Sequence, residues 1–455
     1  MAITTINPAT GETLATYDEF STSEVNAAIE AAHQAYLGWR ETSFAERAER
    51  LHALAAILRE DQERLATLMT CEMGKPITQA RAEIEKCAWG CDFYAEHGEA
   101  FLKSEVIETD ARKSYVAYRP LGVVLAIMPW NFPFWQVLRY GAPALMAGNA
   151  TVLKHASNVM GSALAIEELF VRAGFPKGLF RTLVVRSDAV ERILDDPRIA
   201  AATLTGSTAA GKAVAGAAGS RVKKTVLELG GSDPYLILED ANLDAAVTAC
   251  AAGRLQNSGQ SCIAAKRFIV VDAVREAFEQ KLVDAFRTYR MGDPLDDETN
   301  IGPLAREDLR DDVHAQVMKS VEAGAKVLIG GEIPEGKGAW YPPTILDSVR
   351  QGMPVHDEEV FGPVAAVIAT KDEDEAVSIA NNTRYGLGAA IFTEDFERGE
   401  RIAAERIEVG SCFVNAFVKS DPRLPFGGIK ESGYGRELSH QGIREFTNIK
   451  TIYIA

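Results

Sequence analysis

Short runs of β-branched and apolar residues alternate with stretches of helical periodicity from residue 123 onward, and this rhythm constrains the fold more than any other feature of the chain. The first runs cover residues 123–127, 150–153, 179–185, 201–204 and 225–229. A second set covers residues 235–238, 267–271, 326–329, 364–368, 389–392 and 411–414. Strands separated by helices form βαβ units, so the sequence predicts an α/β fold with parallel sheets.

The chain length indicates more than one domain. A chain of 455 residues is too long for a single hydrophobic core. The two sets of predicted strands meet near residues 230–234, where we place a boundary between two α/β domains. The first hundred residues read as helical, because Ser21 with Glu24 and Ser43 with Glu46 are capping-box patterns that start helices. The segment 113–119 alternates and reads as an exposed strand, and the tail ends in another at 447–454.

Composition excludes several classes of function. Apolar residues make up 47% of the chain and charged residues 25%, as in an ordinary globular protein. A formal charge of −16 argues against a nucleic-acid partner, since phosphate binding needs a basic surface. No apolar run is long enough to span a membrane, and no signal peptide is evident at the N-terminus. The six cysteines lack the paired spacing of metal ligands, so we expect no metal and a reducing cytoplasmic location.

Two short segments carry candidate chemistry. One is Gly259-Gln260-Ser261-Cys262, in which small and polar neighbours could leave a cysteine reactive. The other is Glu228-Leu229-Gly230-Gly231, in which glycines let a carboxylate approach a reacting centre closely. A thiolate and a general base are the groups needed to make and then hydrolyse a thioester. Alone, each has an ordinary structural interpretation, as a buried cysteine and as a carboxylate at a strand end.

The other motifs of the chain give this pair its weight. They occur in a fixed order: Pro129-Trp130-Asn131-Phe132-Pro133, Leu153 to Ser157 (LKHAS), Thr205 to Gly211 (TGSTAAG), Glu358 to Pro363 (EEVFGP), Pro425 to Gly428 (PFGG) and Ser432 to Glu437 (SGYGRE). The set resembles the aldehyde dehydrogenase superfamily from end to end. The resemblance implies two parallel-sheet α/β domains plus a small β oligomerisation arm.

The resemblance also assigns functions to the domains. It implies a dinucleotide-binding domain at residues 1–100 and 121–230, and a catalytic domain at residues 231–431. Residues 101–120 and 432–455 would form the oligomerisation element of a homodimer or homotetramer.

Three residues are the catalytic candidates. Cys262 would attack an aldehyde carbonyl, and Glu228 would activate water to hydrolyse the thioester. Asn131 lies near two prolines that restrict its backbone, so its amide would meet the developing oxyanion together with the Cys262 N–H. The alternative for Asn131 is a turn asparagine. A reactive cysteine also needs a lowered pKa or a nearby base, which we expect from exposure and local dipoles.

The cofactor site departs from the commonest glycine pattern. Gly206 and Ser207 open a glycine-rich turn between a predicted strand and a helix, a position suited to phosphate. In the resembled family, Ser207 contacts the pyrophosphate and Lys154 the adenosine ribose. Many members that prefer NAD carry a glutamate where this chain has Ser157. A neutral hydroxyl beside Lys154 would accept a 2′-phosphate, so we expect NADP as the preferred cofactor, with NAD also accepted.

The nicotinamide end of the cofactor would be held by a second set of residues. Glu359 resembles the family's glutamate that binds the nicotinamide ribose. Phe361 would pack near the ring, and Trp130 completes the set of cofactor contacts. The alternative for Glu359 is a solvated acid in an acidic loop.

Several residues point to an aldehyde with a distal carboxylate. Arg139 follows Asn131 by eight residues and Trp135 by four, which would place them on one helix face. Arginine can pair with a carboxylate through two hydrogen bonds. Ser261 and Ser420 could add hydroxyl donors. This combination looks like the shorter bacterial branch of succinate-semialdehyde dehydrogenases. The alternative for Arg139 is a structural salt bridge.

Other functions stay open on these residues. The substrate could instead be glutarate semialdehyde or a simple aliphatic aldehyde. A relative that forms acyl-coenzyme A or acyl phosphate would lack the water-activating glutamate, and Glu228 therefore favours hydrolysis. A catalytically silent relative would have lost the cysteine, the base or the oxyanion donor, and the chain keeps all three.

Overall fold

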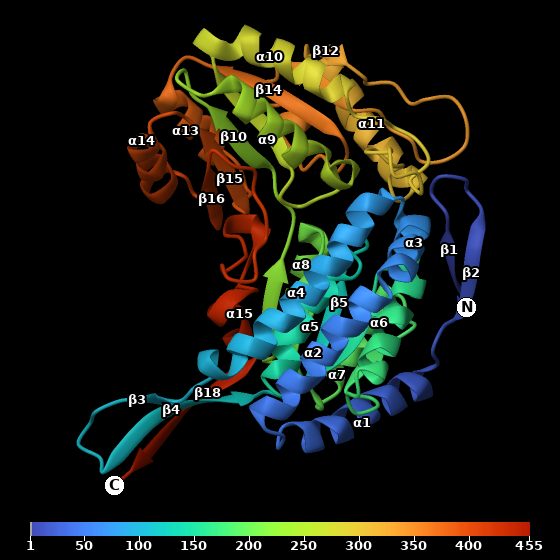
Figure 1. Ribbon diagram of the computed structural model, residues 1–455, viewed down its shortest axis with the longest axis vertical. Helices are drawn as coiled ribbons and strands as arrows, with labels where there is room; N and C mark the ends of the chain where they lie inside the picture. The colour runs from blue at the N-terminus through green and yellow to red at the C-terminus, as the bar shows by residue number, and fades with distance from the viewer. Residues whose placement is uncertain (1) are drawn as a thin grey trace.

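The computed structural model describes residues 2–455 and contains two α/β units with a narrow β arm (Figure 1). In Figure 1 the blue and green unit holds the N-terminal helices and the first large sheet. The yellow and orange unit holds the second sheet, and the arm carries the C-terminus. The predicted α/β fold with two sheet domains and an arm is confirmed.

The first large sheet has six strands in the order β17-β9-β8-β5-β6-β7. Its strands are β5 (Val123–Met128), β6 (Ala150–His155), β7 (Phe180–Thr182), β8 (Ile199–Thr205), β9 (Lys224–Glu228) and β17 (Gly433–Tyr434). Neighbouring strands from β9 to β7 pair in parallel, as the alternation of strands and helices predicts. The short β17 comes from the C-terminal tail and pairs antiparallel with β9.

Helices pack around this sheet. They are α1 (Thr22–Trp39), α2 (Phe44–Glu60), α3 (Gln62–Met73), α4 (Ile77–Phe101), α5 (Trp135–Met146), α6 (Met160–Arg172), α7 (Val190–Asp195), α8 (Thr208–Gly219) and α15 (Ser439–Glu445). The two caps predicted from sequence are present: Ser21 accepts the N–H of Glu24 in a full capping box, and Ser43 accepts the N–H of Glu46. The expectation that the first hundred residues are helical is wrong for the first eighteen. They contain the antiparallel pair β1 (Ala2–Ile6) and β2 (Thr13–Asp18).

The second large sheet has seven strands in the order β12-β13-β14-β11-β10-β15-β16. Its strands are β10 (Asp233–Ile237), β11 (Ala265–Val271), β12 (Lys326–Ile329), β13 (Thr344–Asp347), β14 (Val364–Thr370), β15 (Gly388–Phe392) and β16 (Ser411–Val414). All pairs are parallel except β12 with β13, which is antiparallel. The sheet is therefore mixed, and β13 is the strand that the sequence reading missed.

Each face of this second sheet buries its own hydrophobic cluster. The helices of this unit are α9 (Leu243–Leu255), α10 (Asp272–Arg287), α11 (Glu307–Glu322), α12 (Pro354–Asp357), α13 (Glu373–Asn381) and α14 (Phe396–Arg401). Strands that are covered on both faces read as continuous apolar runs, which explains why most of them could be located in the sequence.

The arm is an antiparallel sheet in the order β18-β4-β3. It consists of β3 (Glu105–Val106), β4 (Lys113–Pro120) and β18 (Thr447–Ile454), so both predicted exposed strands are present and pair with each other. The arm exposes apolar side chains that a folded protein normally buries: Val106 is 71% exposed and Ile449 66%.

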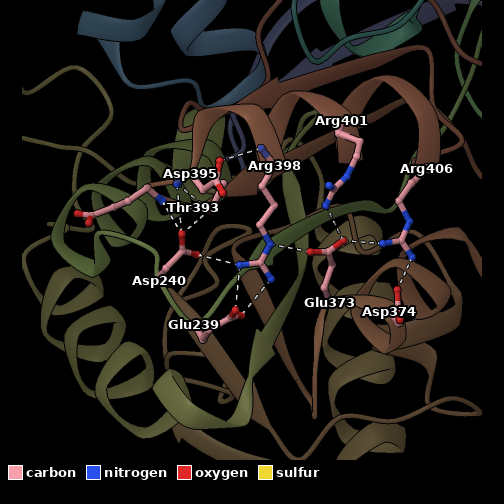
Figure 2. Close-up of polar contacts among 10 residues, drawn as sticks. Glu239, Asp240, Glu373, Asp374, Thr393, Asp395, Arg398, Arg401 and Arg406 are labelled. Carbon is pink, nitrogen blue, oxygen red and sulfur yellow. Dashed lines mark hydrogen bonds and ion pairs between the residues drawn. The ribbon is translucent and has the colours of Figure 1, made fainter.

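A network of ion pairs joins the segment that follows β10 to the helices α13 and α14 of the second unit (Figure 2). Arg398 on α14 lies 2.9 Å from Glu239, which follows β10, and 2.6 Å from Glu373 on α13. Asp240 accepts the hydroxyl of Thr393 at 2.7 Å. Arg398 thus joins three separate segments, and its side chain is only 19% exposed.

Replacing Arg398 with methionine should lower the free energy of unfolding by about 1–2 kcal/mol. This value lies between the losses that are typical when an exposed ion pair and a buried ion pair are broken. The loss arises because Glu239 and Glu373 would face each other without a shared cation. Chemical denaturation measures the change. Arg401→Met is the matched control, because Arg401 is 57% exposed and lies 3.8 Å from Glu373. Equal destabilisation by the two variants would contradict the importance of the Arg398 contacts.

Candidate functional site

Two cavities meet at Cys262. The smaller, of about 250 Å³, is lined by residues of both α/β units, among them Trp130, Ser207 and Glu359. The larger, of about 630 Å³, lies between α4, α5 and the loop 417–426. Cys262 lines both cavities. One thiol is therefore accessible from two directions, an arrangement that lets two different molecules approach the same atom.

The smaller cavity sits at the carboxyl ends of the parallel strands of the first sheet. The strands β5 and β8 end at Met128 and Thr205, and the segments that follow them line the cavity. Ligands of open α/β sheets bind at this edge, outside the carboxyl ends of the strands. The fold itself thus places the cofactor candidates together.

The loop that carries Cys262 is tightly constrained. It follows a kinked turn in which Asn257 and Ser258 have positive φ angles of 53°. Lys266 Nζ, which is buried, donates to the carbonyl oxygens of Ser261 at 2.9 Å and Cys262 at 2.6 Å. The position of the thiol is therefore fixed from the backbone side by a buried ammonium group, which the sequence analysis did not identify.

Cys262 is half-buried, and burial raises the pKa of its thiol to about 11, against the lowering influence of Arg139 and Lys266. The expectation that exposure and local dipoles lower this pKa is wrong, because the effect of burial outweighs that of the nearby cations. At neutral pH the thiol carries its proton, so nucleophilic attack requires a group or a water that accepts it.

Asn131 lies in the loop between β5 and α5 and lines the smaller cavity. Its Nδ2 donates to the carbonyl of Gln260 at 3.1 Å, and Asn257 Nδ2 donates to the Asn131 carbonyl at 2.7 Å. A carboxamide has two N–H donors, so one stays free for a ligand. Asn257 therefore positions the oxyanion candidate, although nothing in the sequence analysis singled it out.

Glu228 is the last residue of β9 and is only 2% exposed. It is not among the residues that line either cavity, whereas Leu229 and Gly230, the next two along the chain, line the smaller one. Neither carboxyl oxygen has a hydrogen-bond partner among residues 2–455. Burial, and then the nearby Glu437, raise the pKa of Glu228 well above its usual range. The raised pKa favours the neutral form of this carboxyl, which is withdrawn from both cavities.

Arg139 lies on α5 and forms a buried ion pair with Glu437. Its Nη2 lies 3.4 Å from Thr205 Oγ1, and its guanidinium stacks on the Phe426 ring at 4.6 Å. The structure thus contains the salt bridge that was the alternative interpretation, although Arg139 also lines the larger cavity. Its carboxylate-binding role stays a prediction. The argument from helical spacing is wrong for Asn131, which precedes α5, but Trp135 and Arg139 do lie four residues apart on α5 and line the same cavity.

The other substrate candidates converge in the larger cavity. Trp135, Ser261 and Ser420 all line it. The hydroxyl of Ser420 accepts two hydrogen bonds, from Trp135 Nε1 at 3.1 Å and from Lys86 Nζ at 2.7 Å. Lys86 comes from α4, where its only sequence signature is an ordinary charged position on an amphipathic helix.

The cofactor candidates fall into two groups. Trp130, Gly206, Ser207, Glu359 and Phe361 line the smaller cavity. The Trp130 and Phe361 rings pack edge to face with centroids 5.7 Å apart, and Ser207 caps α8. Glu359 accepts the N–H of Gly231 at 3.0 Å.

Lys154 and Ser157 form the second group, at the end of β6. Lys154 Nζ donates to Ser187 Oγ at 3.3 Å, and burial lowers the pKa of this lysine. A helix N-terminus, an ammonium group and a carboxylate near two aromatic rings match the phosphate, ribose and ring of a dinucleotide. The residues present therefore fit such a cofactor.

Comparison with known proteins agrees with this geometry. The sequence model that describes the aldehyde dehydrogenase family matches residues 1–452 of this chain. The chain belongs to the aldehyde dehydrogenase family. It is 51% identical over its full length to a Synechocystis protein named probable succinate-semialdehyde dehydrogenase (NADP+), and this match covers all of that protein. It is 51% identical, again over all of both chains, to succinate-semialdehyde dehydrogenase (NADP+) 1 of Mycobacterium tuberculosis.

A solved structure also matches the aldehyde dehydrogenase described here over its full length. The succinic semialdehyde dehydrogenase of Streptococcus pyogenes, crystallised with NADP+, superimposes with a TM-score of 0.97. The two chains are 41% identical, and the match covers all of both.

Within residues 2–455, no group of three or more potential ligands is placed to hold a metal ion. Over the same residues, no helix combines the length and apolar character that a membrane crossing requires.

Proposed function

We propose that this aldehyde dehydrogenase oxidises succinic semialdehyde to succinate through a thioester on Cys262, with NADP as the preferred cofactor and NAD accepted. The observation that carries the proposal is that two cavities meet at one thiol. The smaller cavity has the features of a dinucleotide site, and the larger is lined by groups that can donate hydrogen bonds to a carboxylate. The names of the relatives from Synechocystis and Mycobacterium tuberculosis support this substrate and this cofactor.

The acylation half begins at the thiol. As Cys262 Sγ bonds to the aldehyde carbon, the thiol proton passes to a water molecule in the cavity and the carbonyl oxygen becomes an alkoxide. The free N–H of Asn131 and the backbone N–H of Cys262 stabilise that charge. A bound nicotinamide cofactor supplies the acceptor for the hydride of the aldehyde carbon. Trp135, Ser261 and Ser420 hold the distal carboxylate, and Arg139 adds positive potential behind them.

The hydrolysis half requires Glu228 to move. Rotation toward the cavity would take the carboxyl out of its buried site and lower its pKa, so that it can accept a proton. The ionised carboxylate then removes a proton from water, whose oxygen attacks the thioester carbon. Succinate leaves, and the sulfur regains a proton. Glycines 230 and 231 after the base leave room for this motion.

Cofactor choice rests on the residues at the end of β6. Ser157 is uncharged and begins a short 3₁₀ turn three residues after Lys154. Replacing Ser157 with glutamate should lower kcat/KM for NADP on the order of 100-fold, because a carboxylate would oppose the 2′-phosphate. The same variant should keep its kcat/KM for NAD within a few-fold. Initial rates with each cofactor at saturating aldehyde measure both values, and a parallel fall for NAD would contradict the assignment.

The test of the proposed function is the initial rate of reduced-cofactor formation with succinic semialdehyde, comparing NADP with NAD. Faster turnover with NADP supports the whole proposal. Turnover with NAD alone would keep the substrate and remove the argument from Ser157. Turnover of glutarate semialdehyde or an uncharged aldehyde, without turnover of succinic semialdehyde, would overturn the substrate.

The proposal extends to assembly and location. Residues 1–100 and 121–230 serve as the dinucleotide-binding domain and residues 231–431 as the catalytic domain. The exposed apolar side chains of β3 and β18 support a role for the arm in a homodimer or homotetramer. We place the enzyme in the cytoplasm, where reducing conditions keep the Cys262 thiol available.

A further inference from the structure

We infer that Lys86, on α4, is the principal cation that binds the distal carboxylate of the aldehyde, together with the hydroxyl of Ser420. This inference rests on the proposed function and deepens it. It names a substrate-binding residue that the sequence motifs do not contain.

The geometry of the larger cavity gives the first argument. Residues 79, 82, 83 and 86 line it from one face of α4, and Cys262 lies on its wall with α5 and the loop 417–426. Lys86 Nζ lies 2.7 Å from Ser420 Oγ and 4.5 Å from the centre of the Trp135 ring. An ammonium group has three N–H donors. One is used by Ser420, and no carboxylate lies within ion-pair distance of Lys86 in the described part of the chain.

Ser420 supplies the second argument. Its oxygen accepts hydrogen bonds from both Lys86 and Trp135, so its own O–H is oriented away from these donors. A carboxylate at this point would receive the O–H of Ser420 and an N–H of Lys86. Two adjacent donors of this kind match the two oxygens of a carboxylate.

A comparison with Arg139 gives the third argument. The guanidinium of Arg139 is already paired with the carboxylate of Glu437, and both side chains are nearly fully buried. Its charge is compensated inside the protein, and breaking a buried pair is costly. Lys86 has no such partner. The ligand carboxylate would therefore supply the ion-pair partner that Lys86 lacks among the described residues. At Arg139 it would have to compete with Glu437.

The surroundings of Lys86 make its charge sensitive to pH. Burial, and then Arg139 on α5, lower the pKa of Lys86 to about 8, while Cys87 and Glu83 on α4 and Asp421 in the loop oppose the shift. The ammonium form exists below this pKa and is lost above it. The kcat/KM for a carboxylated aldehyde should therefore fall as pH rises through about 8, because kcat/KM reports the free enzyme.

Steady-state kinetics of Lys86→Met test the inference. We expect KM for succinic semialdehyde to rise about 10- to 100-fold, the range for a lost hydrogen bond to a charged group, with little change in kcat. Butanal, which has the same carbon chain without the carboxylate, should show an unchanged KM. Lys86→Arg should restore most of the affinity. The fall in kcat/KM near pH 8 should disappear in the methionine variant.

The matched control is Lys419→Met, which removes the same charge from an exposed position on the same cavity. Equal effects of the two variants, or equal losses for both aldehydes in Lys86→Met, would overturn the inference. A selective loss in Arg139→Met but not in Lys86→Met would also overturn it.

Binding of succinate, measured by calorimetry, separates this inference from the proposed function. A wild-type enzyme that does not oxidise succinic semialdehyde would refute the function. The inference then stands or falls on whether Lys86→Met weakens succinate binding. Oxidation by the wild type with unaltered succinate binding in Lys86→Met would refute the role of Lys86 alone.

Discussion

Replacing Cys262 with serine should reduce aldehyde oxidation by at least about 10⁴-fold, because a hydroxyl without a strong base is a far weaker nucleophile than sulfur. The substitution keeps the shape of the side chain, so the tight loop held by Lys266 should stay folded. Initial rates of reduced-cofactor formation measure the loss. Cofactor binding, followed by fluorescence, should be unchanged.

Cys412→Ser is the control for this prediction. Cys412 is also half-buried, but it lies on β16 and lines neither of the two cavities that meet at Cys262. It should retain the activity of the unmodified enzyme. Retention of a tenth or more of the activity in Cys262→Ser would contradict a covalent intermediate at this position.

Replacing Glu228 with glutamine should separate the two halves of the reaction. We expect one equivalent of reduced cofactor per subunit to form rapidly. Steady turnover should then be slower by about 10²- to 10⁴-fold, the usual contribution of a general base. Glutamine has the same shape, and Glu228 has no hydrogen-bond partner to lose in the part of the chain that the structure describes. The melting temperature should therefore not fall. Stopped-flow absorbance resolves the burst from the steady phase.

Glu431→Gln serves as the control, because Glu431 lies in the C-terminal segment and pairs with Lys212 at 3.0 Å. It should show normal steady turnover. Loss of the burst itself in Glu228→Gln would mean that Glu228 also receives the thiol proton, and the assignment of its role to hydrolysis alone would be wrong.

Most of the fold could be predicted because its strands are buried on both faces. Continuous apolar runs such as 235–238 and 364–368 stand out from helical stretches, and the alternation implies parallel pairing. The missed elements give a weaker signal. The strand β13 is fully buried, but its only apolar residues, Ile345 and Leu346, lie between Thr344 and Asp347, so no apolar run stands out. The strand β1 has an alternating burial pattern over only five residues, and β17 has two residues in all.

The residues of the site could be located from motifs, but their environments could not. The pairing of Arg139 with Glu437 joins positions far apart in the chain, and periodicity carries no information about such a contact. The raised pKa of the Cys262 thiol results from burial among distant segments. Lys86 reaches the cavity only because α4 packs beside α5. No local sequence pattern distinguishes this lysine from other charged residues of the helix.

The most direct test of a thioester on Cys262 is peptide mass analysis of the Glu228→Gln variant after mixing with succinic semialdehyde and NADP. We expect a single succinyl group on the peptide that contains Cys262, formed in proportion to the burst of reduced cofactor. Reduced cofactor formed without an acyl group on Cys262, or with the group on another cysteine, would contradict it.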